Sequence, residues 1–502
     1  MIQQPLQDFI TTGDRRIVAL VLGGLLALVA VTVGLALAVV GPVYTAVGLA
    51  ALAAGVWVIA GLENALWGVL AVITLLPFAT LPVDIGITPT FLDMALGVAV
   101  GLYLLQWMTG ERRRLTMTPV HGFIILFMLL CLFSFVAGMR HAGMSFTVAR
   151  RLLELLLAMA FALILVDVLD TAEKIKRFVL VLLAGGTLAA LIAIGLWILP
   201  DGTAASILGR LAIIGYPNAG IIQYIEQNPA LSERAIGTAV NPNSLGGTLV
   251  LIAALAVPQL AAEQPLTGKR WHAVPVLGAL GLALVLTFSR GSMLAFAAAV
   301  GFIAVLRYRK LLIVFAVLGV IFLLLPWTQG YIERFIAGFQ GADLATQMRF
   351  GEYQDALTLI GRYPLLGVGF IGTPDIDIYL GVASVYLTIA SNMGLLGMAG
   401  FLLVIGAVFA YGWTAHRHLT QMPGLYPIWL GLNAALVGTL VNGVFDHYFF
   451  NLEFMAAATL FWIYIGLLLS TSRLALAAEQ DRLLREGGSG ILRSTSGRGA
   501  AW

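Results

Sequence analysis

Residues 119–139 read PVHGFIILFMLLCLFSFVAGM, an apolar run that follows the basic cluster Arg112-Arg113-Arg114. As a helix, a run of this length crosses the roughly 30 Å hydrocarbon core of a bilayer. Its backbone amides must bond within the segment, because the core of a membrane offers no water as a partner. The stretch therefore predicts a membrane-spanning helix whose basic flank lies in the cytoplasm.

Similar runs recur along the whole chain, in which 60% of the 502 residues are hydrophobic and only 11% are charged. This composition excludes an ordinary soluble protein and predicts an all-α, polytopic integral membrane protein. We expect about 14 (12–14) spans, since Gly41-Pro42 alone divides the first pair. The expected spans are 17–40, 43–61, 64–80, 91–107, 119–139, 150–168, 177–199, 240–261, 272–288, 291–306, 311–326, 393–413, 425–445 and 452–470.

The Lys and Arg residues set the orientation, because short cytoplasmic loops collect them. Most of the 28 basic residues fall inside if both termini are cytoplasmic (N-in, C-in). A short segment, 1–14, then precedes the membrane domain 15–471, and a cytoplasmic, partly disordered tail follows at 472–502. The long connections, about 200–239 and 327–392, lie outside, and we expect the second to form an extracytoplasmic helical loop.

A few arginines fall on the outer side against this trend, namely Arg150, Arg151, Arg234, Arg290 and Arg349. Charges beside the hydrocarbon are costly and commonly mark functional sites. Cations there suit the phosphate or diphosphate of a lipid. They point to an enzyme or a carrier that handles an anionic lipid on the far face of the membrane.

The first motif with chemical potential is the stretch from Arg234 to Asn241-Pro242-Asn243, at the mouth of a span. Proline suits the first turn of a helix, and Asn241 suits the cap before it. A helix N-cap at the membrane interface is the plain reading. The functional reading adds that the positive end of the helix, with Arg234 and Asn243 nearby, favours an anion.

The second and third motifs contain Arg290 and Arg349. Arg290 lies in a tight hairpin before Gly291, which would let a bulky headgroup approach. A snorkelling arginine at the headgroups is the alternative. Arg349 begins an amphipathic outer segment and could reach the same pocket as Arg290, whereas a helix lying on the membrane surface is the plain alternative.

Two further groups lie at the outer ends of spans. Glu154 sits within a span and needs a partner, for which Arg150 or Arg151 is available by helical spacing, leaving one arginine for a ligand. Asp446 and His447 end a later span. The histidine could act as a base near neutral pH, and the aspartate could orient it, act itself or cap the helix.

Metal and disulfide chemistry are not expected. The single cysteine, Cys131, lies within a span, and no arrangement of His, Asp and Glu has convincing metal-ligand spacing. The net charge of +3 says little for a membrane protein, and nothing in the sequence suggests a nucleic-acid partner.

The motifs together resemble the O-antigen ligase/polymerase superfamily of bacterial membrane glycosyltransferases over residues 90–470. In chain order they are Gly237-Thr238 with Asn241-Pro242-Asn243, Ser289-Arg290-Gly291, Arg349 with Asp355-Ala356, Pro364-Leu365-Leu366-Gly367-Val368-Gly369, and Tyr386-Leu387 with Gly394-Leu395-Leu396-Gly397. Each motif is short, and their order, spacing and common outer placement carry the resemblance.

The resemblance implies a multi-pass enzyme of the bacterial cytoplasmic (inner) membrane with its active site on the extracytoplasmic side. Members move glycans from a polyprenyl diphosphate carrier to a glycan acceptor, without a cofactor and with membrane lipids around them. Arginines are thought to hold the diphosphate, which assigns Arg234, Arg290 and Arg349 to the donor, with Arg150 or Arg151 as a lesser candidate. Other proteins of polysaccharide assembly would be its partners.

One departure affects the expected reaction. Ligase-type members often carry His-Asn-x-Tyr-Leu after the long outer loop, whereas this chain has Ala383 in place of the histidine. This favours a polysaccharide or O-antigen polymerase, or an acceptor that is activated by another group such as Asp446, His447 or Glu226. An O-antigen ligase or a protein O-glycan transferase remains the alternative in the same superfamily. A transporter or flippase of an anionic lipid-linked solute is the alternative of another class.

Overall fold

The structure is a computed structural model that describes residues 41–82, 86–325, 329–342, 344–373 and 381–496, with 27, 30–32, 34 and 38 as isolated positions. The expected segment 1–14, most of the first span and the end of the tail lie outside the described residues. The chain divides into two compact units, Met1–Asn64 and Ala65–Trp502. The described helix of the first unit is α3 (Pro42–Ile59).

The helices that follow are α4 (Leu62–Leu75), α5 (Phe91–Met108), α6 (Val120–Gly138), α7 (Phe146–Val168), α8 (Ala172–Ile198), α9 (Asp201–Gly209), α10 (Pro242–Ala256), α11 (Ala273–Leu286), α12 (Arg290–Leu306), α13 (Lys310–Leu324), α14 (Gln329–Phe339), α15 (Leu344–Arg362), α16 (Val385–Thr414), α17 (His416–Leu419), α18 (Tyr426–Phe445) and α19 (Met455–Ser496). A short antiparallel pair, β1 (Gln223–Tyr224) and β2 (Glu233–Arg234), and five short 3-10 helices complete the described elements.

The predicted helical membrane fold is confirmed for the described part of the chain. Every expected span from 43–61 onward overlaps a helix. Seven helices are long and apolar enough to cross a membrane, namely Phe91–Met108, Val120–Gly138, Ala172–Ile198, Pro242–Leu260, Val385–Thr414, Tyr426–Phe445 and Met455–Leu484. The total of fourteen spans and the N-in, C-in orientation stay predictions.

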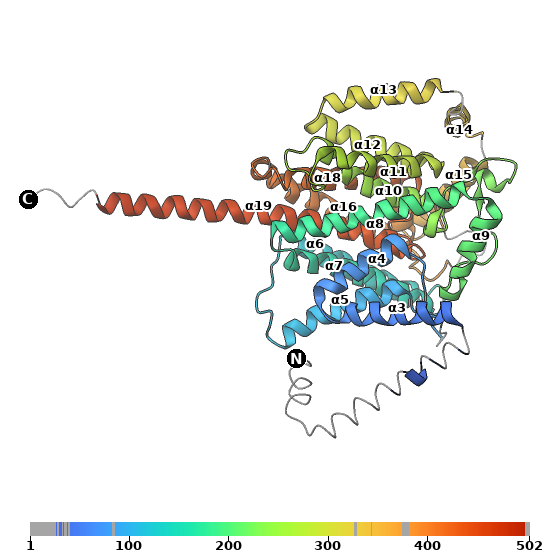
Figure 1. The fold of residues 1–502 in the computed structure, drawn as a ribbon, viewed down its shortest axis with the longest axis horizontal. Coiled ribbons are helices and arrows are strands. Elements are labelled where there is room, and N and C mark those ends of the chain that lie inside the picture. The colour runs from blue at the N-terminus through green and yellow to red at the C-terminus, as the bar shows by residue number, and fades with distance from the viewer. Residues whose placement is uncertain are drawn as a thin grey trace, which may run out of the picture. The chain divides into compact units, whose positions relative to one another are not determined.

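The second unit is a bundle in which α8, α10, α11, α12, α18 and α19 run side by side (Figure 1). Small residues let these helices approach closely, as is common between helices in membranes. A Cβ on Gly438 of α18 would come within 2.8 Å of the Ala295 carbonyl oxygen on α12. A Cβ on Gly466 of α19 would come within 2.7 Å of the Ala162 carbonyl oxygen on α7.

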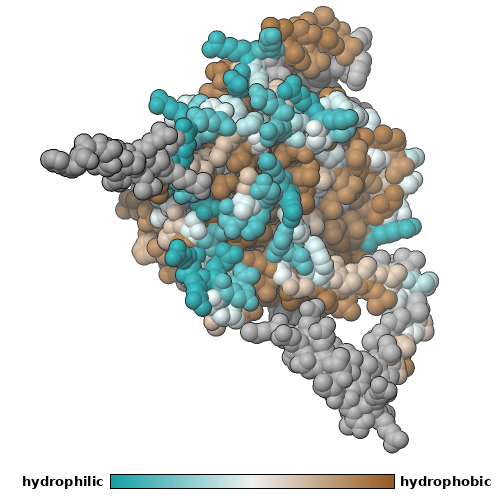
Figure 2. All heavy atoms as spheres, turned by 60° about the vertical axis from the view of Figure 1, so that its left-hand side comes forward, coloured by the Kyte–Doolittle hydropathy of each residue, from teal (hydrophilic) through white to brown (hydrophobic). Residues whose placement is uncertain are grey.

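Hydrophobic side chains also cover much of the surface. Most side chains of α13 are exposed, including Val317 and Leu318. Figure 2 shows wide hydrophobic areas beside a hydrophilic area on one face of the molecule. Exposed apolar areas of this extent are unusual for a protein surrounded by water, and they suit contact with lipid tails.

The expected span 393–413 begins earlier, because α16 already starts at Val385 and is broken at Gly394, where φ is 67°. A loop inserts into this break. Val368 and Gly369 donate their backbone N–H groups to the carbonyl oxygens of Ser391 (2.9 Å) and Asn392 (2.8 Å). Leu395 donates in the opposite direction to the Pro364 carbonyl oxygen at 2.7 Å. The break thus leaves these polar backbone groups paired.

The elements nearest the candidate site lie towards one end of the bundle. In Figure 1, α9, α14 and α15 lie at the end opposite the side to which α19 extends. The first turns of α10 and α12 meet the last turn of α18: an added Cβ would lie 3.1 Å from Asn442 Nδ2 at Gly247, and 3.0 Å from the Phe445 Cβ at Gly291.

Candidate active site at the α10, α12, α15 and α18 ends

Arg234 forms hydrogen bonds with residues near two helix ends. Asn241 caps α10, and its Oδ1 atom accepts from the backbone N–H of Asn243 at 2.9 Å. The Arg234 side chain donates through Nε to the Thr287 carbonyl oxygen at 2.8 Å and through Nη2 to Asn243 Oδ1 at 2.6 Å. The predicted cap is therefore present, and Arg234 connects the first turn of α10 to the segment after α11.

Arg290 and Arg349 line the same cavity, of ≈ 290 Å³, although they come from α12 and α15. We call it the arginine cavity. Its other walls are largely apolar and include Leu294, Phe350 and Phe445. Two guanidinium groups in an apolar cavity are the combination that the sequence predicted for an anionic lipid headgroup.

Neighbouring elements hold Arg290 in place. Its Nη2 atom lies 3.5 Å from Thr346 Oγ1 at the start of α15. The Arg290 guanidinium group also lies against Gly338 of α14, where an added Cβ would displace it. Gly291 packs on α18, because a Cβ added to Gly291 would lie 3.0 Å from the Cβ of Phe445.

Asp446 lies behind the arginine cavity, with 2% of its surface exposed. Its Oδ1 atom lies 3.5 Å from Nη2 of Arg349. Burial raises the pKa of Asp446 to about 6, although Arg349 and Arg234 pull it down. Its Oδ2 atom and both amide atoms of Asn442, one helical turn earlier, are buried without a hydrogen-bond partner among the described residues.

A second, larger cavity of ≈ 490 Å³ adjoins this region, and we call it the polar chamber. Its polar lining comes from five parts of the chain and includes Asn241, Arg151, Glu352, Asn392, His447 and Glu453. The Arg151 guanidinium pairs with the Glu453 carboxylate at 3.1 Å. The candidate residues of the sequence therefore fall into two adjacent sites rather than one pocket.

Helix α15 contributes to both sites. Arg349 and Tyr353, four residues apart, line the arginine cavity, whereas Glu352 lines the polar chamber. The Glu352 Oε2 atom accepts from the backbone N–H of Ala383 at 2.9 Å. Tyr353 donates to the Ala383 carbonyl oxygen at 3.2 Å. Sequence reasoning missed Glu352, and its spacing of three residues from Arg349 was the available signal.

His447 lines the polar chamber as a neutral side chain. The backbone N–H of Glu453 donates to Asn451 Oδ1 at 2.7 Å, which fixes the orientation of that amide. Asn451 Nδ2 therefore donates to His447 Nδ1 at 2.8 Å, and the ring proton is assigned to Nε2. Burial lowers the pKa of His447 to about 4. The histidine thus offers an N–H donor to the chamber.

Arg150 and Glu226 lie apart from both cavities in the part of the chain that the structure describes. Arg150 pairs with Asp93 and, at 3.2 Å, with Glu154, so the ion pair expected within this helix is present. Glu226 is exposed in the short 3-10 helix Ile225–Gln227. Neither residue is placed to contact a ligand that occupies the arginine cavity or the polar chamber.

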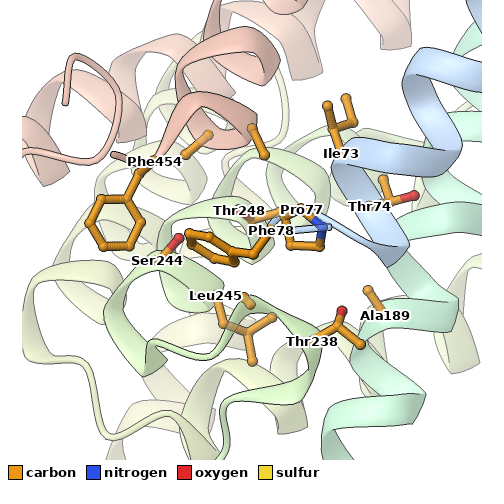
Figure 3. A pocket seen from close by; sticks show the side chains of 13 residues that line it. Ile73, Thr74, Pro77, Phe78, Ala189, Thr238, Ser244, Leu245, Thr248 and Phe454 are labelled. Atoms are coloured by element: carbon orange, nitrogen blue, oxygen red, sulfur yellow. The ribbon is translucent and has the colours of Figure 1, made fainter. Parts of the chain in front are cut away.

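A third gap lies between α4, α8 and α10 (Figure 3). Its walls, which include Ile73, Leu245 and Phe454, are mostly apolar, and its volume is ≈ 20 Å³. Such a space has room for about one water molecule and none for a sugar, so it is a packing gap.

Metal ligands are not grouped within the described ranges, where no cluster of three His, Cys, Asp or Glu side chains could hold an ion. Metal independence stays a prediction.

Comparison with protein families gives a match in this part of the chain. Residues 275–402 match the family model described as O-antigen ligase. A comparison with curated proteins gives no match. The matched segment includes Arg290, Arg349, Glu352 and Ala383, and so covers one side of each cavity. The match over residues 275–402 confirms that this part of the chain resembles the O-antigen ligase/polymerase superfamily, as the motifs from Ser289-Arg290-Gly291 to Gly397 predicted.

Proposed function

We propose that the protein joins glycan repeat units, taking each from a polyprenyl diphosphate carrier and transferring it to an acceptor sugar on the outer face of the bacterial cytoplasmic membrane. The match of residues 275–402 to the O-antigen ligase family model supports membrane glycan transfer as the class of reaction. The observation that carries the donor assignment is the arginine cavity, in which Arg290 and Arg349 meet from different helices.

The arginine cavity suits both the diphosphate and the lipid of such a donor. Guanidinium groups bind phosphate oxygens through charge-assisted, often bidentate hydrogen bonds. When the glycosidic bond to the carrier breaks, negative charge grows on the diphosphate, and fixed cations with little water around them stabilise it strongly. Apolar walls such as Leu294 and Phe350 suit the lipid next to the diphosphate.

The acceptor needs a group that takes its proton, and we assign Glu352 to this role. The acceptor hydroxyl oxygen forms a bond with the anomeric carbon, and the hydroxyl proton passes to the Glu352 carboxylate. The bond from that carbon to the carrier diphosphate breaks, and its electron pair stays on the diphosphate beside Arg290 and Arg349. The backbone N–H group of Ala383 orients Glu352. Ala383 stands at the position where related ligases often carry a histidine.

Reconstitution tests the proposal. Full-length protein in lipid nanodiscs, given a polyprenyl diphosphate-linked repeat unit, should yield chains of increasing length on a gel. Arg290→Ala and Arg349→Ala should each lower the rate by roughly 10²–10³, as expected for a lost donor to the developing charge. Arg140→Ala is the matched control, since Arg140 is exposed and donates to the nearby Ala137 carbonyl oxygen.

Three outcomes separate the alternatives. A single transfer to a preformed acceptor, without chain growth, would favour a ligase. Movement of the intact lipid-linked unit across the membrane, without a new glycosidic bond, would favour a carrier. Near-normal chain growth by both arginine variants would remove the arginine cavity from the mechanism.

A further inference from the structure

The polar chamber differs in charge from the arginine cavity beside it. Its charged lining consists of two carboxylates, Glu352 and Glu453, and one guanidinium, Arg151. That guanidinium is paired with Glu453, and the adjacent His447 is neutral. Among the described lining residues, therefore, negative charge exceeds positive charge by one. A phosphate or carboxylate on a ligand would meet repulsion here, in contrast to the arginine cavity.

The uncharged lining suits hydroxyl groups. The Nε2–H of His447 can donate, and the side chains of Asn241 and Asn392 add amide groups. Phe370 and Phe450, whose ring centroids lie 6.4 Å apart, provide apolar faces against which the C–H side of a sugar ring can pack. The volume of ≈ 490 Å³ falls within the roughly 300–1,000 Å³ usual for small-molecule sites.

Residues at the break in α16 form part of the wall of the polar chamber. The carbonyl oxygens of Ser391 and Asn392 are used by the inserted loop, so their side chains line the chamber from a fixed backbone. Phe370, directly after that loop, lines the chamber as well. The chamber is therefore a formed polar site rather than a gap between mobile side chains.

We propose that the polar chamber binds the acceptor as an uncharged, hydroxyl-rich sugar chain and discriminates against acceptors that carry phosphate. The inference rests on the proposed glycan transfer and names the acceptor class of that same site. Opposite electrostatic character in the two cavities would keep the diphosphate of the donor out of the acceptor position. A phosphate on the acceptor has the same sign of charge as the chamber lining. It should therefore weaken binding of the acceptor roughly fivefold to twentyfold at the effective dielectric constant of a protein surface.

Acceptor binding can be measured without the reaction. The probes are a panel of hexose and N-acetylhexosamine oligosaccharides, each paired with its singly phosphorylated form, offered to full-length protein in nanodiscs. Saturation-transfer NMR should show a neutral member that binds and a phosphorylated form that binds roughly fivefold to twentyfold more weakly. His447→Ala should weaken the neutral probe severalfold, because the Nε2–H donor is lost.

Charge removal gives the sharper test. Glu453→Gln removes one chamber carboxylate and releases Arg151, so it should bring the phosphorylated probe to within about twofold of the neutral one. Glu173→Gln, at an exposed glutamate in the first turn of α8, is the matched control and should leave the ratio unchanged. Unchanged thermal unfolding of each variant would confirm that the fold is intact.

The outcomes separate this inference from the proposed function. Equal or tighter binding of the phosphorylated probe to the unmodified protein would overturn the inference, as would failure of every neutral probe to bind at millimolar concentration. The inference would also be overturned if the affinities of the neutral and phosphorylated probes were unchanged in both His447→Ala and Glu453→Gln. If neutral probes bind as expected and no glycosidic bond forms with the lipid-linked donor, the chamber stands as a sugar site and the transfer proposal fails.

Discussion

At the scale of single residues, Asp446 connects the two arginines that the sequence placed far apart. The Asp446 carboxylate pairs with Arg349, and Arg234 is close enough to lower its pKa. Because Asp446 is buried and lines neither cavity, we assign it as a positioning residue for Arg349 rather than as a base.

This role predicts a specific pH dependence. Burial raises the pKa of Asp446 to about 6, so above that pH the carboxylate is ionised and can pair with Arg349. Below it the carboxyl is protonated and the ion pair weakens. The transfer rate should therefore fall as pH drops through about 6. Asp446→Asn should lower the rate about tenfold at pH 8, as for a lost charge-assisted bond, and abolish that inflection.

The control for this measurement is His447→Ala. The pKa of His447 is lowered to about 4, so the histidine stays neutral through the range in which Asp446 titrates. An inflection near pH 6 that survives in Asp446→Asn would assign it to another group, and one that disappears only in His447→Ala would contradict the positioning role.

Glu352 supplies a second prediction at this scale. As the acceptor base, it should contribute roughly 10²–10⁴ to the rate, so Glu352→Gln should lower kcat by that factor. The glutamine keeps an oxygen that can accept from Ala383, and binding of the lipid-linked donor should change less than threefold. Glu352→Asp should recover part of the rate. A glutamine variant with near-normal kcat would assign the proton to a different acceptor.

The sequence predicts some of these residues better than others. Arg290 and Arg349 are conspicuous because arginine is uncommon on the outer side, and they share a cavity as expected. Glu352 is inconspicuous, because a glutamate on an amphipathic helix is ordinarily solvated. Arg150 resembles a ligand arginine in the sequence, but it pairs with Asp93 from α5, a contact that spacing along the chain does not reveal.

At the scale of elements, the glycine-rich run after α15 has a structural explanation. Gly367 and Gly369 have φ angles of 65° and 82°, which favour glycine, and their loop fills the break of α16 at Gly394. A Cβ on Gly367 would overlap the backbone of Ser391 and Asn392. Hydropathy predicted the helix and not its break, since the break depends on hydrogen bonds from a distant loop.

This packing predicts a large effect of one methyl group. Gly367→Ala should lower the free energy of unfolding by about 2–4 kcal/mol, because strain at positive φ adds to a clash with backbone that has no room to move. Thermal unfolding in detergent would measure it. Gly361→Ala is the matched control, since a Cβ there meets nothing within 4 Å and Gly361 lies in helix α15. Equal midpoints for both variants would contradict the role of the loop.

At the scale of the whole molecule, each expected span from 43–61 onward overlaps a described helix, because the need to bond the backbone inside a membrane leaves little choice of structure. Hydropathy did not predict α9, α14 and α17, or the extension of α19 to Ser496. It did not predict that the candidate residues divide between two cavities. That division depends on which face of α15 each side chain occupies, as Arg349 and Glu352 show, and on packing between α10, α12 and α18.

The proposed outer position of both cavities depends on the orientation of the bundle, which cysteine labelling can test. The only natural cysteine, Cys131, is buried, so the unmodified protein should give little signal with a membrane-impermeant maleimide. Asn218 and Glu263 are exposed on loops that follow α9 and α10. If most Lys and Arg residues are cytoplasmic, Asn218→Cys should label in intact spheroplasts and Glu263→Cys only after lysis. The reverse pattern would turn the arginine cavity towards the cytoplasm, where a glycan already exported on its carrier could not reach Arg290 and Arg349.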